Sequence, residues 1–264
     1  MATPEDQPSS VWMKRQQRYD PVGECIYCRK APPTSDEHII ARGLGGALIL
    51  PDASCSQCAK TTSSLEDHCQ AKMYASLRRQ FGFPTYHKKR TRPARRLSVD
   101  GVEQAVQDHD YPGLVVALTF PAPSILGLTP PAAEVFTGGV AIGMLPEFGE
   151  RLNRVKKGGR EVSFRSGLEA KTYGRMLAKI GHAYAVAELG LHGFEPWLPP
   201  IILADDPPYI GKLVGGAMMP AGDGSDLHAI GLDGEIAPGL AVVHLRLFTD
   251  RDLPSYWIVA GRHR

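Results

Sequence analysis

The sequence has no apolar run of the length that a membrane-spanning helix needs, and its polar first 20 residues lack the apolar core of a secretory signal. It also has no glycine-rich phosphate loop, no serine nucleophile elbow and no repeat of solenoid period. These absences argue against a membrane protein, a P-loop nucleotidase, an α/β-type serine hydrolase and a repeat protein. We therefore expect a cytoplasmic protein with no membrane partner and a flexible tail over residues 1–20.

Cysteine is scarce, with five residues in 264, and four of them form two C-x2-C pairs separated by 26 residues. Each C-x2-C turn can point two thiolates at one centre, and a second such turn completes a tetrahedral set. Reduced cytoplasmic thiols favour a metal ion over disulfides. The fifth cysteine, Cys69, lies in a helical pattern and is interpreted as a small core residue. The sequence thus predicts a structural Zn²⁺ ion bound by Cys25, Cys28, Cys55 and Cys58.

The segment between the cysteine pairs carries an acidic and histidine run over residues 36–38 and a Gly45-Gly46 step. We expect a first strand that begins or ends at His38, a glycine turn, and a second strand over residues 47–50. A helix is predicted over residues 61–81, because apolar residues recur there at every fourth position. The expected local fold is a ββα unit held by zinc. The residues of the apolar stripe are Leu65, Cys69, Met73, Leu77 and Phe81.

The paired cysteines around D-E-H-I-I, followed by L-G-G, resemble the bacterial branch of the HNH endonucleases over residues 21–85, about a quarter of the chain. The resemblance implies a ββα-metal nuclease module that hydrolyses phosphodiester bonds. It also implies that His38 is the general base and that Glu37 helps to hold one divalent cation such as Mg²⁺ or Mn²⁺. Histidine suits this role because its ordinary pKa lies near neutrality.

Two positions depart from the pattern of that family. The family places an asparagine near the catalytic histidine and an asparagine or histidine after the last cysteine, whereas this chain has Ala59 there and its single asparagine is Asn153. Helical spacing from Ala59 makes Glu66 the first candidate for a replacement ligand and His68 the alternative, although both can equally be exposed polar residues. A backbone carbonyl could orient His38 instead. If neither substitution works, the module binds without cutting.

The net charge of +2 hides an uneven distribution, with +7 in residues 1–96 and −5 in residues 97–264. Most of the excess lies in residues 71–96, which contain nine Lys or Arg residues and no acidic residue. Positive charge of this density next to the predicted helix favours binding to a phosphate backbone, with DNA ahead of RNA as the partner. A homodimer that cuts both strands stays open. The predicted contact residues are Arg78, Arg79, Lys88, Lys89, Arg90, Arg92, Arg95 and Arg96.

The fold class expected for the whole chain is α+β. An HNH-like zinc module with its basic extension spans residues 21–96, and a larger domain with a mostly antiparallel sheet and one long helix spans residues 97–264. The long helix is predicted over residues 167–189, with Lys171, Arg175, Lys179 and His182 interpreted as a solvated basic face. Strands are predicted over residues 201–203, 209–214, 227–232, 240–248 and 256–260.

Two functions are consistent with these patterns. The first is a metal-dependent HNH-type endonuclease whose second domain supplies target choice or a partner surface. The second is a zinc-stapled nucleic-acid-binding protein that does not cut, for which Ala59 and the missing local asparagine are the evidence.

Overall fold

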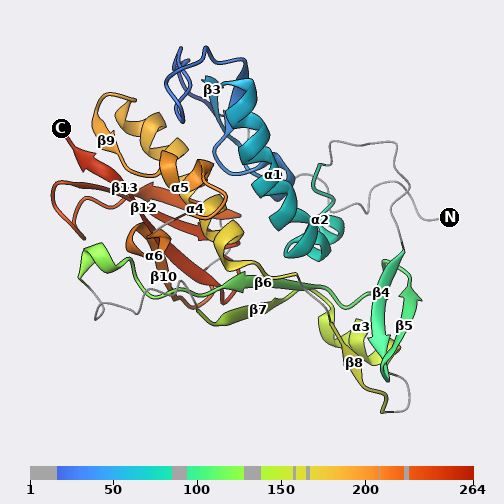
Figure 1. The fold of residues 1–264 in the computed structure, drawn as a ribbon. Helices are drawn as coiled ribbons and strands as arrows, with labels where there is room; N and C mark the ends of the chain where they lie inside the picture. Colours follow the sequence, from blue (N-terminus) through green and yellow to red (C-terminus); the bar gives the residue numbers. More distant parts are fainter. Residues whose placement is uncertain are drawn as a thin grey trace.

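The protein is a mixed α+β structure whose strands pair antiparallel, except for one short parallel pair, among the residues that the structure describes (Figure 1). It is a computed structural model. The helices and strands gather around one long helix near the middle of the molecule, with the N-terminal ββα segment on one side of it and the C-terminal sheet on the other. The structure describes residues 17–84, 94–127, 138–156, 159–164, 167–207, 209–222 and 226–264.

The N-terminal segment has the predicted ββα order. Strands β2 (Ser35–His38) and β3 (Leu48–Ser54) pair antiparallel, and helix α1 (Ser56–Lys72) follows at once. A short 3-10 helix, Arg42–Leu44, lies between the strands and ends at Gly45, whose φ of 86° favours glycine. The glycine turn is thus where the sequence predicts it, and the second strand, predicted over residues 47–50, begins at Leu48 and continues to Ser54.

The predicted helix over residues 61–81 is wrong at its start and in its continuity. Helix α1 already begins at Ser56, because Cys55 is its N-terminal cap residue and Cys58 lies in its first turn. The chain then breaks at Met73 and Tyr74 before α2 (Ala75–Gln80). At this break the buried Tyr74 hydroxyl bonds that of Tyr173, 2.9 Å away, so a tertiary contact accompanies the interruption.

The flexible tail expected over residues 1–20 is a wrong prediction for Gln17 to Tyr19. Residues 1–16 lie outside the described part of the chain, but β1 (Gln17–Arg18) pairs parallel with β3. The Gln17 amide bonds the Ala47 carbonyl at 3.0 Å, and the Tyr19 hydroxyl bonds Glu188 at 2.6 Å. Because of these hydrogen bonds, Gln17 to Tyr19 are part of the folded structure.

The C-terminal half contains the expected antiparallel sheet and long helix. In the sheet, β13 (Pro254–His263) is central, β12 and β11 follow on one side, and β10 and β9 pair with different parts of its other edge. Helix α4 (Ala170–Leu189) packs across this sheet. The other bounds are β9 (Phe194–Pro196), β10 (Val214–Met218), β11 (His228–Leu232) and β12 (Leu240–Leu247).

Two of the predicted strands are wrong. Residues 199–203 form the short helix α5 (Pro199–Leu203). Proline is favoured at the first position of a helix, because the N–H that it lacks would have no partner within the helix there. Residues 210–213 form α6 (Ile210–Leu213), and the strand starts only at Val214. Both runs are short and apolar, so periodicity alone could not separate helix from strand.

The solvated basic face predicted for α4 is also wrong. Arg175, Lys179 and His182 are 7%, 0% and 0% exposed, and Lys171 alone of the four is exposed. The reason is that α4 is covered twice, by β12 and β13 on one face and by α1 and α5 on another. Its central run from Met176 to Val186 is apolar nearly all round, which is typical of a helix buried on every side.

A smaller part of the structure extends from this core, at the lower right of Figure 1. A two-stranded ribbon connects to a three-stranded sheet, which α3 (Phe148–Val155) accompanies. None of the helices in the described ranges combines the length and apolarity that crossing a bilayer requires. The strands are β4 (Arg95–Val99), β5 (Val102–Val106), β6 (Leu114–Leu118), β7 (Val140–Met144) and β8 (Val162–Ser163).

The two expected domains share a single hydrophobic core. Buried residues from Cys25 to Phe83 and from Val115 to Ala260 form one contiguous cluster. A chain of buried phenols crosses it, in which Tyr173 bonds both Tyr74 and Tyr256 at 2.9 Å and Tyr256 donates to the Leu118 carbonyl. The N-terminal ββα segment and the C-terminal half are therefore packed as one unit.

The closest approach of α4 to the sheet depends on Gly181. A Cβ at this position would overlap the buried Ile258 side chain, so we expect Gly181→Ala to lower the free energy of unfolding by about 1–3 kcal/mol. Gly149→Ala in α3 is the matched control, because a Cβ there meets nothing within 4 Å. Urea unfolding measures both, and equal stability of the two variants would contradict the tight packing.

Candidate functional site

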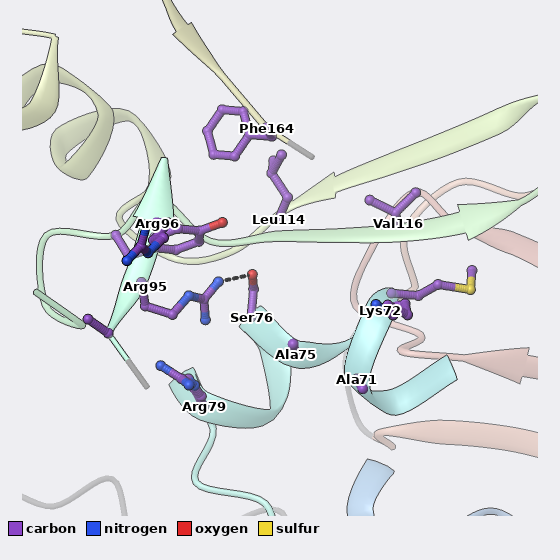
Figure 2. Close-up of a pocket in the computed structure, with 13 residues that line it drawn as sticks. Ala71, Lys72, Ala75, Ser76, Arg79, Arg95, Arg96, Leu114, Val116 and Phe164 are labelled. Atoms are coloured by element: carbon purple, nitrogen blue, oxygen red, sulfur yellow. Dashed lines mark hydrogen bonds between the residues drawn. The ribbon is translucent and has the colours of Figure 1, made fainter. Parts of the chain in front are cut away.

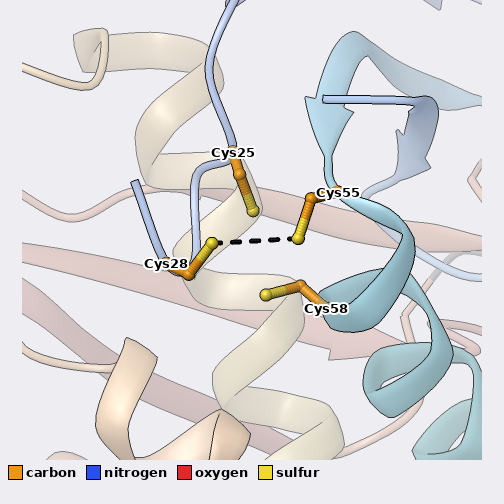
Figure 3. A group of neighbouring side chains, drawn as sticks. All are labelled: Cys25, Cys28, Cys55 and Cys58. Atoms are coloured by element: carbon orange, nitrogen blue, oxygen red, sulfur yellow. Dashed lines mark hydrogen bonds between the residues drawn. The ribbon is translucent and has the colours of Figure 1, made fainter. Parts of the chain in front are cut away.

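Four cysteines converge on one point at the edge of the ββα segment (Figure 3). Cys25 and Cys28 come from the loop before β2, whereas Cys55 and Cys58 begin α1. Their Sγ atoms all lie within 4.8 Å of one another, and those of Cys28 and Cys55 are 3.8 Å apart. Tetrahedral Zn²⁺ with Zn–S bonds of about 2.3 Å requires sulfurs about 3.8 Å apart. The cluster can therefore hold a metal ion such as zinc, as the sequence predicts.

The surroundings of the four thiols differ. Backbone N–H groups, that of Lys30 first, lower the pKa of Cys28 to about 6. Burial raises the pKa of Cys25 and that of Cys58. A bound cation would stabilise the thiolate form of all four, and because the knuckles belong to the loop before β2 and to α1, it would fix these elements to each other.

Glu37 and Glu66, the predicted ligands of a catalytic cation, do lie together, but a lysine lies between them. The Nζ atom of Lys179 is 2.6 Å from Oε1 of Glu37 and 2.5 Å from Oε1 of Glu66. It also donates to the carbonyl oxygens of His38 and Ile39. Lys179 is fully buried and Glu37 nearly so. Burial lowers the pKa of Lys179, but the two carboxylates outweigh it and raise the pKa overall.

These carboxylates do not fit a divalent cation as they stand. Each already bonds the ammonium, and a metal ion could take the same position only if Lys179 left it. Burial raises the pKa of Glu66, and the ammonium opposes that effect. No catalytic step can be assigned to a cation held by Glu37 and Glu66 in this arrangement.

His68, the alternative ligand, is elsewhere. Its Nε2 atom is 3.2 Å from a carboxylate oxygen of Glu169, at the start of α4. The replacement ligand that the sequence favours, Glu66, is thus near Glu37, whereas His68 is bonded to a different partner.

His38 ends β2, one residue after Glu37, and successive side chains of a strand point to opposite faces. While Glu37 is buried, His38 is half-buried. Desolvation lowers the pKa of His38, and the positive charge of Lys179 adds to this effect. No hydrogen bond joins its ring to another residue in the described part of the chain. His38 is therefore a neutral imidazole at pH 7 that can accept a proton.

The sequence missed Lys179, although one signal could have found it. The residues around it in α4 are apolar on all sides, and a charge inside such a helix has to be buried with a partner. The identity of the partners was not readable, because Glu37 and Glu66 are 142 and 113 positions away.

The basic residues form a second candidate feature, and only part of them is described. Lys88, Lys89, Arg90 and Arg92 lie outside the described residues. Arg78 is bonded to backbone carbonyls, those of Gly43 at 2.8 Å and Pro84 at 3.1 Å, so it holds the module together.

Arg79, Arg95 and Arg96 line one cavity of about 240 Å³ (Figure 2). Arg95 bonds the Ser76 hydroxyl and lies over the Tyr111 ring at 3.5 Å. Arg79 is paired with Asp108 at 3.2 Å, outside this cavity's lining. Lys72 and Phe164 complete the cationic and aromatic wall. The cavity can accept an anionic group together with a flat ring.

Comparison of the chain with protein-family models, curated proteins and solved structures gives no match.

Loss of one cysteine is expected to abolish the metal centre. Cys28→Ser should lower bound zinc from about one ion per chain to near none. It should also lower Tm by more than about 10 °C, because the binding free energy of a structural metal ion contributes to the free energy of folding. Cys69→Ala is the control, since Cys69 is buried away from the cluster and should leave the zinc content unchanged. Elemental analysis and thermal melting measure both, and a Cys28→Ser protein that keeps its ion would contradict the assignment.

Proposed function

We propose that this chain is a zinc-stabilised, HNH-type endonuclease that hydrolyses phosphodiester bonds with His38 as its general base. The observation that carries the proposal is the position of His38, which is half-buried and ends β2 in a ββα unit whose preceding loop and helix carry the cysteine cluster; its lowered pKa favours the neutral imidazole. We keep DNA as the proposed substrate, a cytoplasmic location as the setting, and a homodimer as an arrangement that would cut both strands.

The chemistry assigned to the chain's own residues is simple. The His38 imidazole takes a proton from a water molecule as that water attacks phosphorus; the P–O bond to the 3′ oxygen breaks, and the leaving 3′ oxygen takes a proton from solvent. Arg42 is exposed, and its positive charge contributes to the lowered pKa of His38. This charge can neutralise part of the negative charge of the phosphate group. The cavity lined by Arg79, Arg95 and Arg96 binds the sugar-phosphate backbone of the nucleic acid at a second position along its strand.

The second candidate function is nucleic-acid binding without cleavage. One observation favours it: both carboxylates expected to hold a cation are bonded to Lys179, and Ala59 offers no ligand. In this case the cysteine cluster and the arginine cavity have the same roles, and His38 has none.

Nicking of supercoiled plasmid separates the two functions. We expect zinc-loaded wild type to nick, and His38→Ala to nick at least about 100-fold more slowly, because proton transfer by a positioned base contributes that much. Since the pKa of His38 is lowered, the rate should hold down to a pH below 6.5 and fall only as the imidazole becomes protonated. His192→Ala changes an exposed histidine, 74% accessible, and serves as the control.

Equal nicking rates of His38→Ala and wild type would show that His38 is not the general base. Binding without nicking by wild type, on DNA and on RNA, would make the second function the correct one.

The arginine cavity predicts a salt-dependent affinity. Arg95→Gln combined with Arg96→Gln should weaken nucleic-acid binding and reduce the slope of log K against log[salt] by about two, because two phosphate contacts are lost. Arg160→Gln combined with Lys171→Gln removes the same charge from exposed positions outside the cavity. Titrations at several salt concentrations measure the slopes, and an equal loss in both double variants would exclude the cavity as the contact.

A further inference from the structure

We propose that the ammonium of Lys179 is the resident cation of a four-oxygen site, in the position that a divalent metal ion would otherwise occupy between Glu37 and Glu66. In the proposed nuclease, this covalently attached cation then positions the backbone of His38. This inference rests on the proposed function only for its bearing on cleavage. The cation site itself is a feature of the fold.

The ligand set is the first step. Four oxygens converge on Nζ: carboxylate oxygens of Glu37 and Glu66 at 2.6 and 2.5 Å, the Ile39 carbonyl at 3.3 Å, and the His38 carbonyl. Carboxylate and carbonyl oxygens are the donors that hard divalent cations prefer. They come from β2, from the residue after it and from α1, so they converge only in the folded chain. An ammonium has three N–H donors, one fewer than the oxygens around it.

The charge is the second step. In their ionised form the two carboxylates carry two negative charges, and Lys179 returns one positive charge. A divalent ion would match the two carboxylates in full, so removal of the lysine charge should turn these oxygens into a metal site.

The origin of the cation is the third step. Lys179 belongs to α4 in the C-terminal half, whereas all four oxygens belong to the N-terminal ββα segment. Because Lys179 bonds the His38 carbonyl, it also fixes the backbone that carries the proposed base. Lys179 is fully buried and cannot touch a substrate, so it is a positioning residue.

The test is Mn²⁺ binding by zinc-loaded protein without nucleic acid, followed by electron paramagnetic resonance. We expect wild type to show no Mn²⁺ site that depends on Glu37 or Glu66. Lys179→Met, which shortens the side chain by one atom and removes its charge, should bind about one Mn²⁺ per chain at least ten times more tightly than wild type does and show a higher Tm with Mn²⁺. Lys179→Met combined with Glu37→Gln and Glu66→Gln should lose that site. Lys171→Met, on the exposed end of the same helix, should behave as wild type.

Three outcomes would overturn the inference. The first is Mn²⁺ binding by wild type that Glu66→Gln abolishes, because the ammonium would then not hold the position. The second is a folded Lys179→Met protein that gains no Mn²⁺. The third is a Lys179→Met protein that stays unfolded at every Mn²⁺ concentration while the triple variant folds. Absence of nicking by wild type would contradict the nuclease proposal but not the cation site, since Mn²⁺ binding is measured independently of cleavage.

Discussion

A buried lysine ammonium joins the two halves of this protein. Lys179 lies in the middle of α4 with no exposure to solvent, and its charge is balanced by Glu37 and Glu66 from the opposite half of the chain. Burial of an unpaired ammonium would be strongly unfavourable, so α4 cannot be placed in the core unless the ββα segment supplies these carboxylates. The reverse also holds for Glu66, because burial raises the pKa of its carboxyl group and the Lys179 ammonium opposes that effect. The arrangement of the ββα segment on the C-terminal half therefore depends on this contact.

Two histidines, the buried His182 and the partly buried His228, support the same interface in neutral form. The Nε2–H of His182 donates to the Ile26 carbonyl in the first cysteine knuckle, at 2.8 Å, and that of His228 donates to the Leu44 carbonyl, at 2.9 Å. Both acceptors are backbone carbonyls, which fixes these nitrogens as donors. Desolvation lowers the pKa of each histidine to about 4, so neither carries a charge at neutral pH. The interface thus includes the Lys179 ion-pair cluster and neutral hydrogen bonds from these two histidines to backbone carbonyls.

The proposed site differs from the resemblance noted in the sequence at one chemical point. In the family that the sequence resembles, a carboxylate beside a histidine implies a bound divalent cation. In this structure Glu37 instead bonds the Lys179 ammonium, and the His38 side chain lies on the other face of the strand. The cysteine cluster can hold a metal ion, the Lys179 ammonium bonds the strand that carries His38, and three arginines line one cavity. The half-buried imidazole of His38 on this strand is the feature on which the proposal of hydrolysis depends.

The sequence by itself determined the features that depend on local spacing. The C-x2-C pairs predicted a cluster that can hold a metal ion, the glycine step predicted the turn before β3, and alternation over Ala241 to Leu247 predicted a sheet strand. Each of these depends on residues that are close in the chain. Short apolar runs such as 201–203 were misassigned, because a few residues carry no period that separates helix from strand.

Only the tertiary structure decided which charges are buried and with what they pair. Lys179 was expected in solvent, and it is the centre of the interface because α4 is covered on more than one face. Its partners lie more than 110 positions away, and pairing over such a distance leaves no trace in the pattern of either segment. Whether Glu37 binds a metal or an ammonium thus depended on which distant helix packs against its strand, and local sequence does not specify that packing.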